Sequence, residues 1–221
     1  MAIRLTEQAL AERKDTILHT AYHLFCEFGV DGVSLEQIAK EANVGTSAVY
    51  RYFETKANLL WLTQKILWEE LVSKIHTDGH ARLSSAKSGF EELSMLLYRF
   101  KLLYTEHSKY LLFSNDYKMY LVRNRLQLPK AVYDQLMEPV YAIFLSALQR
   151  GHADGSISRK EPVEDQLFAI LGVMRGFTEQ IVLCDRMCAG GNPLEGRFDL
   201  VYQYVLRALE ARDAGDAPST L

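Results

Sequence analysis

The chain has 221 residues, of which 48% are hydrophobic and 24% charged, so it is long enough for one large or two small globular domains. Its formal net charge of −3 excludes a broad basic surface, so any contact with nucleic acid must rest on a few placed groups. Three cysteines without framework spacing indicate free thiols in a reducing cytoplasm, and no apolar run approaches the length of a membrane span, so we expect no membrane partner.

The first predicted helix extends from about residue 7 to residue 28, and Gly29 closes it. Its apolar face, spaced as a helix requires, comprises Ile17, Ala21, Leu24 and Phe25. His19, His23 and Cys26 share this helix at spacings that could bind zinc. Because the histidines lie on or near the exposed face and no fourth ligand is evident, we interpret them as surface residues and predict no metal or cofactor.

Residues 34–53 indicate two short helices joined by a tight turn. Ser34 is the expected N-cap of the first helix, whose apolar residues are Leu35, Ile38, Ala39 and Ala42. A short turn that ends at Gly45 breaks this spacing. The second helix, at about 46–53, leaves five side chains largely outside the core: Thr46, Ser47, Tyr50, Arg51 and Tyr52. Small hydroxyl side chains, tyrosines and an arginine on one short helix suit a DNA major groove.

The rest of the chain also shows helical spacing, and we predict an all-α fold. Thr55 is the expected cap of a helix that starts at Lys56. Further predicted helices lie at about 89–106, 109–124, 130–151, 162–187 and 194–212. Polar stretches at 76–88 and 152–162 separate some of them, and residues 214–221 are predicted to be disordered.

Residues 17–60 resemble the TetR family of bacterial transcriptional regulators. The family pattern runs from a helix with a Phe and a closing Gly to a Ser/Thr-Lys pair. Its elements occur here in order as Phe25, Gly29, Ser34, Ile38-Ala39, Ala42-Asn43-Val44, Tyr50, Phe53 and Thr55-Lys56. Two positions depart from the commonest pattern: Gly45 stands where a capping Ser or Thr is frequent, and Glu54 stands where Pro is frequent.

The resemblance implies a helix-turn-helix DNA-binding domain over residues 1–60 and a ligand-binding and dimerisation domain over residues 61–213. It also implies a homodimer through the last two helices, at about 162–187 and 194–212, as a four-helix interface. Burial of these two helices within one monomer would produce the same apolar faces, so the sequence leaves both interpretations open.

Seven residues are candidates for contact with a double-stranded DNA operator: Ser34, Thr46, Ser47, Tyr50, Arg51, Tyr52 and Lys56. Thr46 and Ser47 lie at the entry of the predicted recognition helix, where capping is their alternative role. The resemblance implies phosphate contacts for Tyr50 and Lys56. Arg51 reaches either a guanine or a phosphate, and the sequence leaves both open.

The predicted ligand-binding and dimerisation domain, residues 61–213, is rich in aromatic residues, some of which carry hydroxyls or have polar neighbours. Five of them are candidates for an effector pocket: Tyr104, Phe113, Tyr117, Tyr120 and Tyr141. Aromatic walls with a few polar anchors suit a planar or apolar ligand. For each single residue, an ordinary core position is the simpler interpretation.

Together these features favour a cytoplasmic, ligand-responsive transcriptional regulator, a repressor that a small apolar or aromatic molecule releases from a palindromic operator. No phosphate-binding or hydrolytic motif occurs, so we expect no enzyme. Two alternatives stay open. One is a small-molecule sensor that does not bind DNA, which the slight excess of acidic residues in 1–60 favours. The other is a TetR-like regulator without a diffusible ligand. A metal-dependent enzyme built on the histidines of the first helix ranks last.

Overall fold

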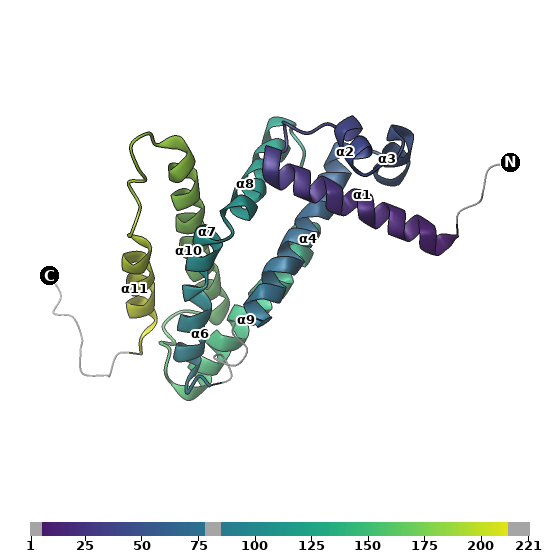
Figure 1. Ribbon diagram of the computed structural model, residues 1–221. Helices are drawn as coiled ribbons and strands as arrows, with labels where there is room; N and C mark the ends of the chain where they lie inside the picture. The colour runs from purple at the N-terminus through teal and green to yellow at the C-terminus, as the bar shows by residue number, and fades with distance from the viewer. Residues whose placement is uncertain (1–5, 78–84, 212–221) are drawn as a thin grey trace. The chain divides into compact units, whose positions relative to one another are not determined.

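The computed structural model describes residues 6–77 and 85–211, and in these residues all regular secondary structure is helical (Figure 1). An isolated bridge joins Ile157 to Glu210. The prediction of an all-α fold is confirmed, and the tail predicted to be disordered, 214–221, lies outside the described residues. The helices are α1 (Glu7–Phe28), α2 (Leu35–Glu41), α3 (Thr46–Phe53), α4 (Lys56–Thr77), α6 (Gly89–Tyr98), α7 (Phe100–Thr105), α8 (Ser108–Arg123), α9 (Lys130–Asp154), α10 (Val163–Met187) and α11 (Phe198–Leu209).

The helix predicted at 89–106 is two helices in the structure, α6 and α7. They meet at Arg99, whose N–H donates to the carbonyl of Leu96, three residues back, at 3.2 Å. The backbone at Arg99 keeps a helical conformation (φ −66°, ψ −19°). The side-chain spacing therefore gives no signal of this junction.

The C-terminal end of α9 and the start of α11 also differ from the prediction. α9 continues past Gly151 and stops before Gly155, where φ is +77° and glycine has the freedom that other residues lack. The predicted start of the last helix at 194 moves to Phe198 because Asn192 makes a turn of its own. The side-chain oxygen of Asn192 accepts a hydrogen bond from the N–H of Leu194 at 2.9 Å.

The described residues form two compact units. The first contains the residues up to Glu70 and Lys109–Tyr133, and so includes α1 to α3 with most of α4 and α8. The second contains Leu71–Ser108 and the residues from Asp134 on, and so includes α6, α7, α10, α11 and most of α9. The functional division expected at residue 60 stays a prediction.

The core of the first unit is built around α1. Three of the four residues predicted for its apolar face are buried, namely Ile17, Ala21 and Phe25. The core face is turned slightly from the prediction, since Leu24 is half-buried while Tyr22 is only 1% exposed. The ring of Phe25 stacks on the ring of Phe113 in α8, with centroids 6.0 Å apart. Helix α8 is thus an integral part of the unit that contains α2 and α3.

In the second unit, α6 begins in close contact with α9. A Cβ on Gly89 would overlap the backbone of Gly151, so glycine is required for this approach. The N–H of Gly89 donates to the carboxylate of Asp154 at 2.7 Å, and the N–H of Phe90 donates to the hydroxyl of Ser156 at 3.0 Å. The first turn of α6 is therefore satisfied by the loop that follows α9.

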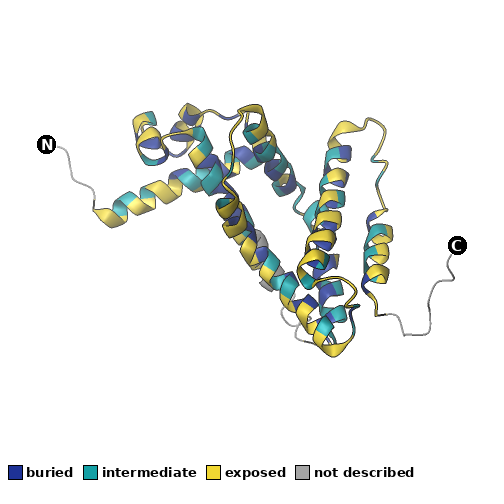
Figure 2. Cartoon of the chain, turned by 180° about the vertical axis from the view of Figure 1, so that it is seen from behind, coloured by how far each residue is buried: buried dark blue, intermediate teal, exposed yellow. Residues whose placement is uncertain are grey.

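Helix α10 has exposed positions along much of its length (Figure 2). By length and composition alone α10 could cross a bilayer, so the expectation that no apolar run approaches that length does not hold for α10. This is weak evidence for a membrane, because a core helix of a globular protein passes the same test. Near its middle, Arg175 and Glu179 form an ion pair at 3.7 Å.

Candidate nucleic-acid interface

The two short helices α2 and α3 are joined as the sequence predicts. Ser34 caps α2, and its hydroxyl oxygen accepts a hydrogen bond from the N–H of Gln37 at 3.1 Å. In the turn, Asn43 takes the left-handed conformation with φ +53°. Gly45 is the N-cap of α3 without a side-chain hydrogen bond, so the first N–H groups of α3 have no side-chain cap.

The exposed face of α3 contains the predicted contact residues. Ala48, Val49 and Phe53 are buried and fix the orientation of the helix. The side chains left toward solvent are Ser47, Tyr50 and Arg51, and half-buried beside them are Thr46 and Tyr52. Ser47, Tyr50 and Arg51 are three and four residues apart and share one face.

Two of these side chains already have partners within the unit. The hydroxyl of Tyr50, a residue 47% exposed, donates to the carboxylate of Glu36 in α2 at 3.5 Å. The guanidinium of Arg51 lies 5.0 Å from the centroid of the Tyr52 ring, and its Nη2 donates to the Tyr52 hydroxyl at 3.4 Å. These contacts hold both side chains on the exposed face of α3.

The side chain of Lys56 is directed into the unit. Its Nζ donates to the carbonyls of Val30 and Val33, both at 2.6 Å, and lies 5.8 Å from the centroid of the Phe25 ring. Desolvation lowers the pKa of this ammonium, and the nearby Asp31 opposes the shift. In this structure Lys56 therefore holds the α1–α2 loop in place, and a phosphate contact by its side chain stays a prediction.

Helix α8 also holds the α1–α2 loop. Oδ2 of Asp116 accepts a hydrogen bond from the N–H of Val30 at 3.4 Å. Arg123 pairs with Asp31 at 2.7 Å, although both side chains are more than half exposed. Gly29 opens this loop with φ +74°, and a Cβ there would approach Oδ2 of Asp116 to 2.8 Å. Sequence reasoning missed this role of α8, because nothing local in the chain links residues so far apart.

The turn between α3 and α4 explains the glutamate found where the family favours proline. Glu54 has φ +60° and ψ −53°, and the N–H of Thr55 donates to the carbonyl of Phe53 at 2.6 Å. This is a γ-turn, a strained conformation. Proline is fixed near φ −65° and cannot adopt it. The predicted cap of α4 is present, since the Thr55 hydroxyl accepts from the N–H of Asn58 at 3.1 Å.

The five residues predicted for an effector pocket are divided between the two units. Phe113, Tyr117 and Tyr120 lie on α8 in the first unit, where Phe113 and Tyr117 are buried and burial raises the pKa of Tyr117 to about 12. Tyr104 and Tyr141 belong to the second unit, where the Tyr104 ring lies 5.5 Å from that of Phe198. Phe113 and Tyr104 thus pack against other aromatic rings of their own units.

A polar residue that the sequence did not single out lies in the core of the first unit. Gln64 on α4 is 1% exposed, and its Nε2 has no hydrogen-bond partner among the described residues. An unpaired buried amide group costs free energy, so it calls for a partner such as a water molecule or a ligand. The sequence did not mark Gln64 as a buried polar residue.

The histidines of α1 lie on its surface. His19 and His23 are exposed, and His19 lies 3.6 Å from Asp15. Over residues 6–77 and 85–211, no three side chains of the types that bind metals are grouped so that they could hold an ion.

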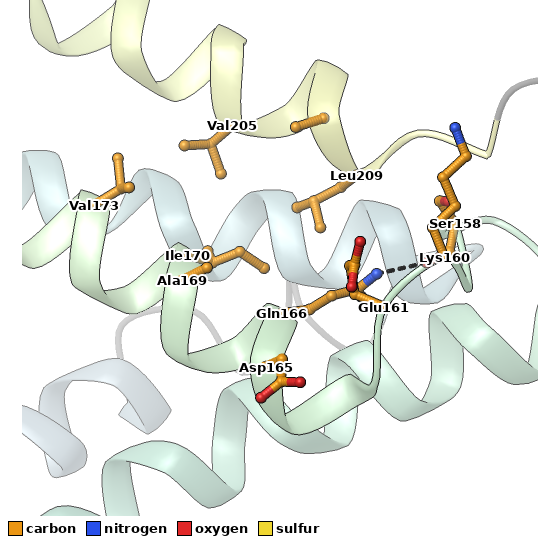
Figure 3. A pocket seen from close by; sticks show the side chains of 11 residues that line it. Ser158, Lys160, Glu161, Asp165, Gln166, Ala169, Ile170, Val173, Val205 and Leu209 are labelled. Atoms are coloured by element: carbon orange, nitrogen blue, oxygen red, sulfur yellow. Dashed lines mark hydrogen bonds between the residues drawn. The ribbon is translucent and has the colours of Figure 1, made fainter.

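In the second unit, α10 and α11 enclose an open groove of about 480 Å³ (Figure 3). Its apolar side chains include Ile170, Val173, Val205 and Leu209. Polar residues border one end, where Gln166 Nε2 donates to the carbonyl of Ser158 at 2.7 Å. Outside the groove, further apolar side chains are exposed on the same two helices: Phe168 (75%), Leu200 (52%) and Tyr204 (62%).

Comparisons with known proteins agree with this geometry. The family described as "Bacterial regulatory proteins, tetR family" matches residues 17–61, which contain α2, α3 and the ends of their neighbours. The Probable acrEF/envCD operon repressor of Escherichia coli (strain K12) is 38% identical over 82 residues, which are 36% of this chain and 36% of the repressor. The chain therefore matches about a third of the length of this curated relative.

Solved structures resemble the chain over most of its length. The fatty acid degradation regulator FadR from Bacillus halodurans has a TM-score of 0.65 and 20% identity, covering 88% of this chain and 94% of that one. The transcriptional regulator FadR from Bacillus subtilis, solved in complex with stearoyl-CoA, has a TM-score of 0.64 and 18% identity, covering 88% and 98%. At these identities the likeness shows the fold alone, and the family assignment rests on the sequence match at residues 17–61. Residues 17–61 of the chain are therefore a domain of the TetR family of bacterial regulatory proteins.

Proposed function

We propose that this chain is a DNA-binding transcriptional regulator, a repressor that leaves its palindromic operator when a small molecule binds. The observation that carries the proposal is the exposed face of α3. Ser47, Tyr50 and Arg51 are exposed there, while three buried residues of the same helix fix its orientation. Such a face presents hydroxyl and guanidinium groups to base edges and phosphates.

We retain all the residues that the sequence predicts at the DNA interface, and we change the role of one of them, Lys56. Ser34, Thr46, Ser47, Tyr50, Arg51 and Tyr52 contact DNA directly. Lys56 acts first by fixing the α1–α2 loop, because its ammonium is occupied by two carbonyls of that loop. The backbone N–H groups at the start of α3, which have no side-chain cap, add to the phosphate contacts.

The proposed operator complex is a homodimer formed through α10 and α11. The support is the groove between these helices together with Phe168 and Tyr204, which are apolar and more than half exposed. Gly172 and Gly176 on α10 have open space above them, so a second helix can approach closely. Two copies pairing face to face would bury this surface and bring two recognition helices to one palindrome.

The proposed effector is a small apolar or aromatic molecule. Three of the aromatic candidates, Phe113, Tyr117 and Tyr120, remain its proposed contacts within the first unit. Tyr104 and Tyr141 belong to the second unit, where they stay a separate prediction. Gln64 is added as a polar anchor in the first unit, since its unpaired amide would donate to an oxygen of the ligand. A relative of the same fold was solved with stearoyl-CoA, a ligand with a long apolar chain, which is compatible with this class.

The proposed release is a shift between two populations. The effector binds more tightly to a state in which the two recognition helices no longer match the operator. Within the first unit, α8 is placed to transmit such a shift, because Asp116 and Arg123 hold the loop that leads into α2. An effector that displaces α8 would therefore loosen the position of α2 and α3.

A gel-shift titration of the full-length protein on the DNA upstream of its own gene tests the proposal. We expect a specific complex that weakens as salt is raised and dissociates when the effector is added. The alternative is a small-molecule sensor that does not bind DNA, and the exposed carboxylates of Glu36, Glu41 and Glu54 around α3 favour it. Absence of any complex tighter than that with unrelated DNA would contradict the proposal and favour this alternative.

A further inference from the structure

Glu36 is an exposed carboxylate among the residues proposed to meet DNA. It is the second residue of α2, two positions after the cap Ser34. Its Oε1 accepts the hydrogen bond from the Tyr50 hydroxyl of α3 at 3.5 Å. The carboxylate therefore lies where the start of α2 meets the exposed face of α3, among the proposed contacts.

The carboxyl of Glu36 stays ionised near neutral pH. Its own backbone N–H, the hydroxyl of Ser34 and the hydroxyl of Tyr50 all lower its pKa, the backbone N–H most of all. An ionised carboxylate accepts hydrogen bonds and cannot donate them. Beside DNA phosphates it is repelled, so Glu36 lowers the affinity for any DNA that offers it no donor.

The edges of the bases in the major groove offer such a donor in few places. Guanine presents two acceptors, and thymine presents an acceptor and a methyl group. Adenine presents its N6 donor beside the N7 acceptor, which repels a carboxylate. Cytosine presents its N4 amino group as a donor, with no acceptor of its own beside it in this groove. Among the four bases, cytosine therefore fits an isolated carboxylate best.

We infer that Glu36 reads a cytosine in each operator half-site by accepting a hydrogen bond from its N4 amino group. Without DNA, the Tyr50 hydroxyl donates to the Glu36 carboxylate. On binding, this hydroxyl turns to a phosphate, and the cytosine amino group donates to the carboxylate in its place. Glu36 then repels sites that lack the cytosine and accepts sites that have it, so an acidic residue adds specificity. The inference rests on the proposed function and adds a specificity residue on α2, outside the recognition helix.

Selection of bound sequences from a library of randomised duplexes tests this inference, with full-length wild type, Glu36→Gln and Glu41→Gln compared. Glu41 is the matched control, because it is an exposed glutamate at the other end of α2. In wild type we expect a cytosine at one fixed position of each half-site, preferred by roughly 5- to 150-fold over other bases. The glutamine at 36 both donates and accepts, so the preference at that position moves to adenine, while Glu41→Gln keeps cytosine.

Glu36→Asp is a second variant that keeps the charge and shortens the side chain. We expect it to reduce the preference at the same position without changing the base, and thermal melting establishes that each variant is folded. Identical base preferences in wild type and Glu36→Gln overturn the inference and leave the proposed function standing. Loss of the cytosine in Glu41→Gln as well overturns it too, because charge alone would then be responsible. A wild-type chain that enriches no sequence overturns both.

Discussion

The exposed face of α3 and the exposed face of α10 and α11 have opposite chemistry. On α3, Tyr50 and Arg51 are each held by a partner within the unit, so the exposed groups are few, polar and placed. On α10 and α11, Phe168 and Tyr204 are apolar and more than half exposed beside an open groove. Placed polar groups suit a partner of fixed shape such as DNA, whereas apolar area suits a partner of similar chemistry. Binding through the face of α3 would depend on where a few polar groups lie, whereas binding through the face of α10 and α11 would depend on how much apolar surface is buried.

The largest effect is expected from a charge on the apolar face. If α10 and α11 pair two copies, Phe168→Glu buries an unpaired carboxylate at a cost of about 3–5 kcal/mol, so the dissociation constant of the dimer rises by roughly 100-fold or more. Sedimentation equilibrium measures this constant. Gln149→Glu, at an exposed position of α9, is the control and should leave it unchanged. A dimer as tight as wild type in Phe168→Glu would show that this face does not pair the copies.

Lys56→Met tests how far the ammonium of Lys56 fixes the position of α2 and α3. The methionine keeps an unbranched stem but leaves the carbonyls of Val30 and Val33 without their donor. We expect the free energy of unfolding, measured by urea titration, to fall by about 2–3 kcal/mol. Lys65→Met on the same helix removes only a surface pair with Glu69 and should change it by less than about 0.5 kcal/mol. Equal changes in the free energy of unfolding of the two variants would show that Lys56 does not hold the α1–α2 loop in place.

Arg51→Ala tests the polar face directly. We expect operator affinity to fall by about 1–2 kcal/mol, measured by fluorescence anisotropy at several salt concentrations. If Arg51 reads a guanine, discrimination at one base pair relaxes; if it holds a phosphate, the salt dependence falls by about one unit of slope. Tyr52→Phe keeps the ring beside the guanidinium and removes its hydrogen-bonded oxygen, so its effect should be smaller. Unchanged affinity in Arg51→Ala would take Arg51 out of the interface.

The smallest effect is expected at the strained turn that joins α3 to α4. Glu54→Gly relieves the positive φ, and after the extra chain entropy of glycine the gain in unfolding free energy is about 1 kcal/mol. Glu54→Ala retains a Cβ and should give no gain. Glu54→Pro, the residue common in the family, should destabilise the protein because its φ is fixed near −65°. Urea titration of the three variants decides, and a stable Glu54→Pro would contradict the γ-turn.

Local signals predicted the first unit well. The bounds of α1 to α3 and the caps Ser34 and Thr55 follow from spacing and cap chemistry, which act within a few residues. The exposed face of α3 follows from the same periodicity. The limits of α11 were less predictable, because the turn at Asn192 competes with helix over residues that the pattern also allows.

Contacts between distant parts of the chain could not be predicted from one sequence. The carbonyls that bind Lys56 lie 23 and 26 residues away, and the bond from Val30 to Asp116 spans 86 residues. The link between Glu36 and Tyr50 spans only 14 residues, yet it depends on the angle between α2 and α3, which spacing does not define.

Footprinting of the full-length protein on the DNA it selects tests whether two copies bind one palindrome through α3. We expect protection of two half-sites related by two-fold symmetry, with centres about 10 base pairs apart or a multiple of that spacing. We also expect Tyr50→Ala to weaken protection of both half-sites together, because each copy presents the same face of α3. A single protected half-site without symmetry, or no protection at any concentration that leaves unrelated DNA free, would contradict binding of one palindrome by two copies.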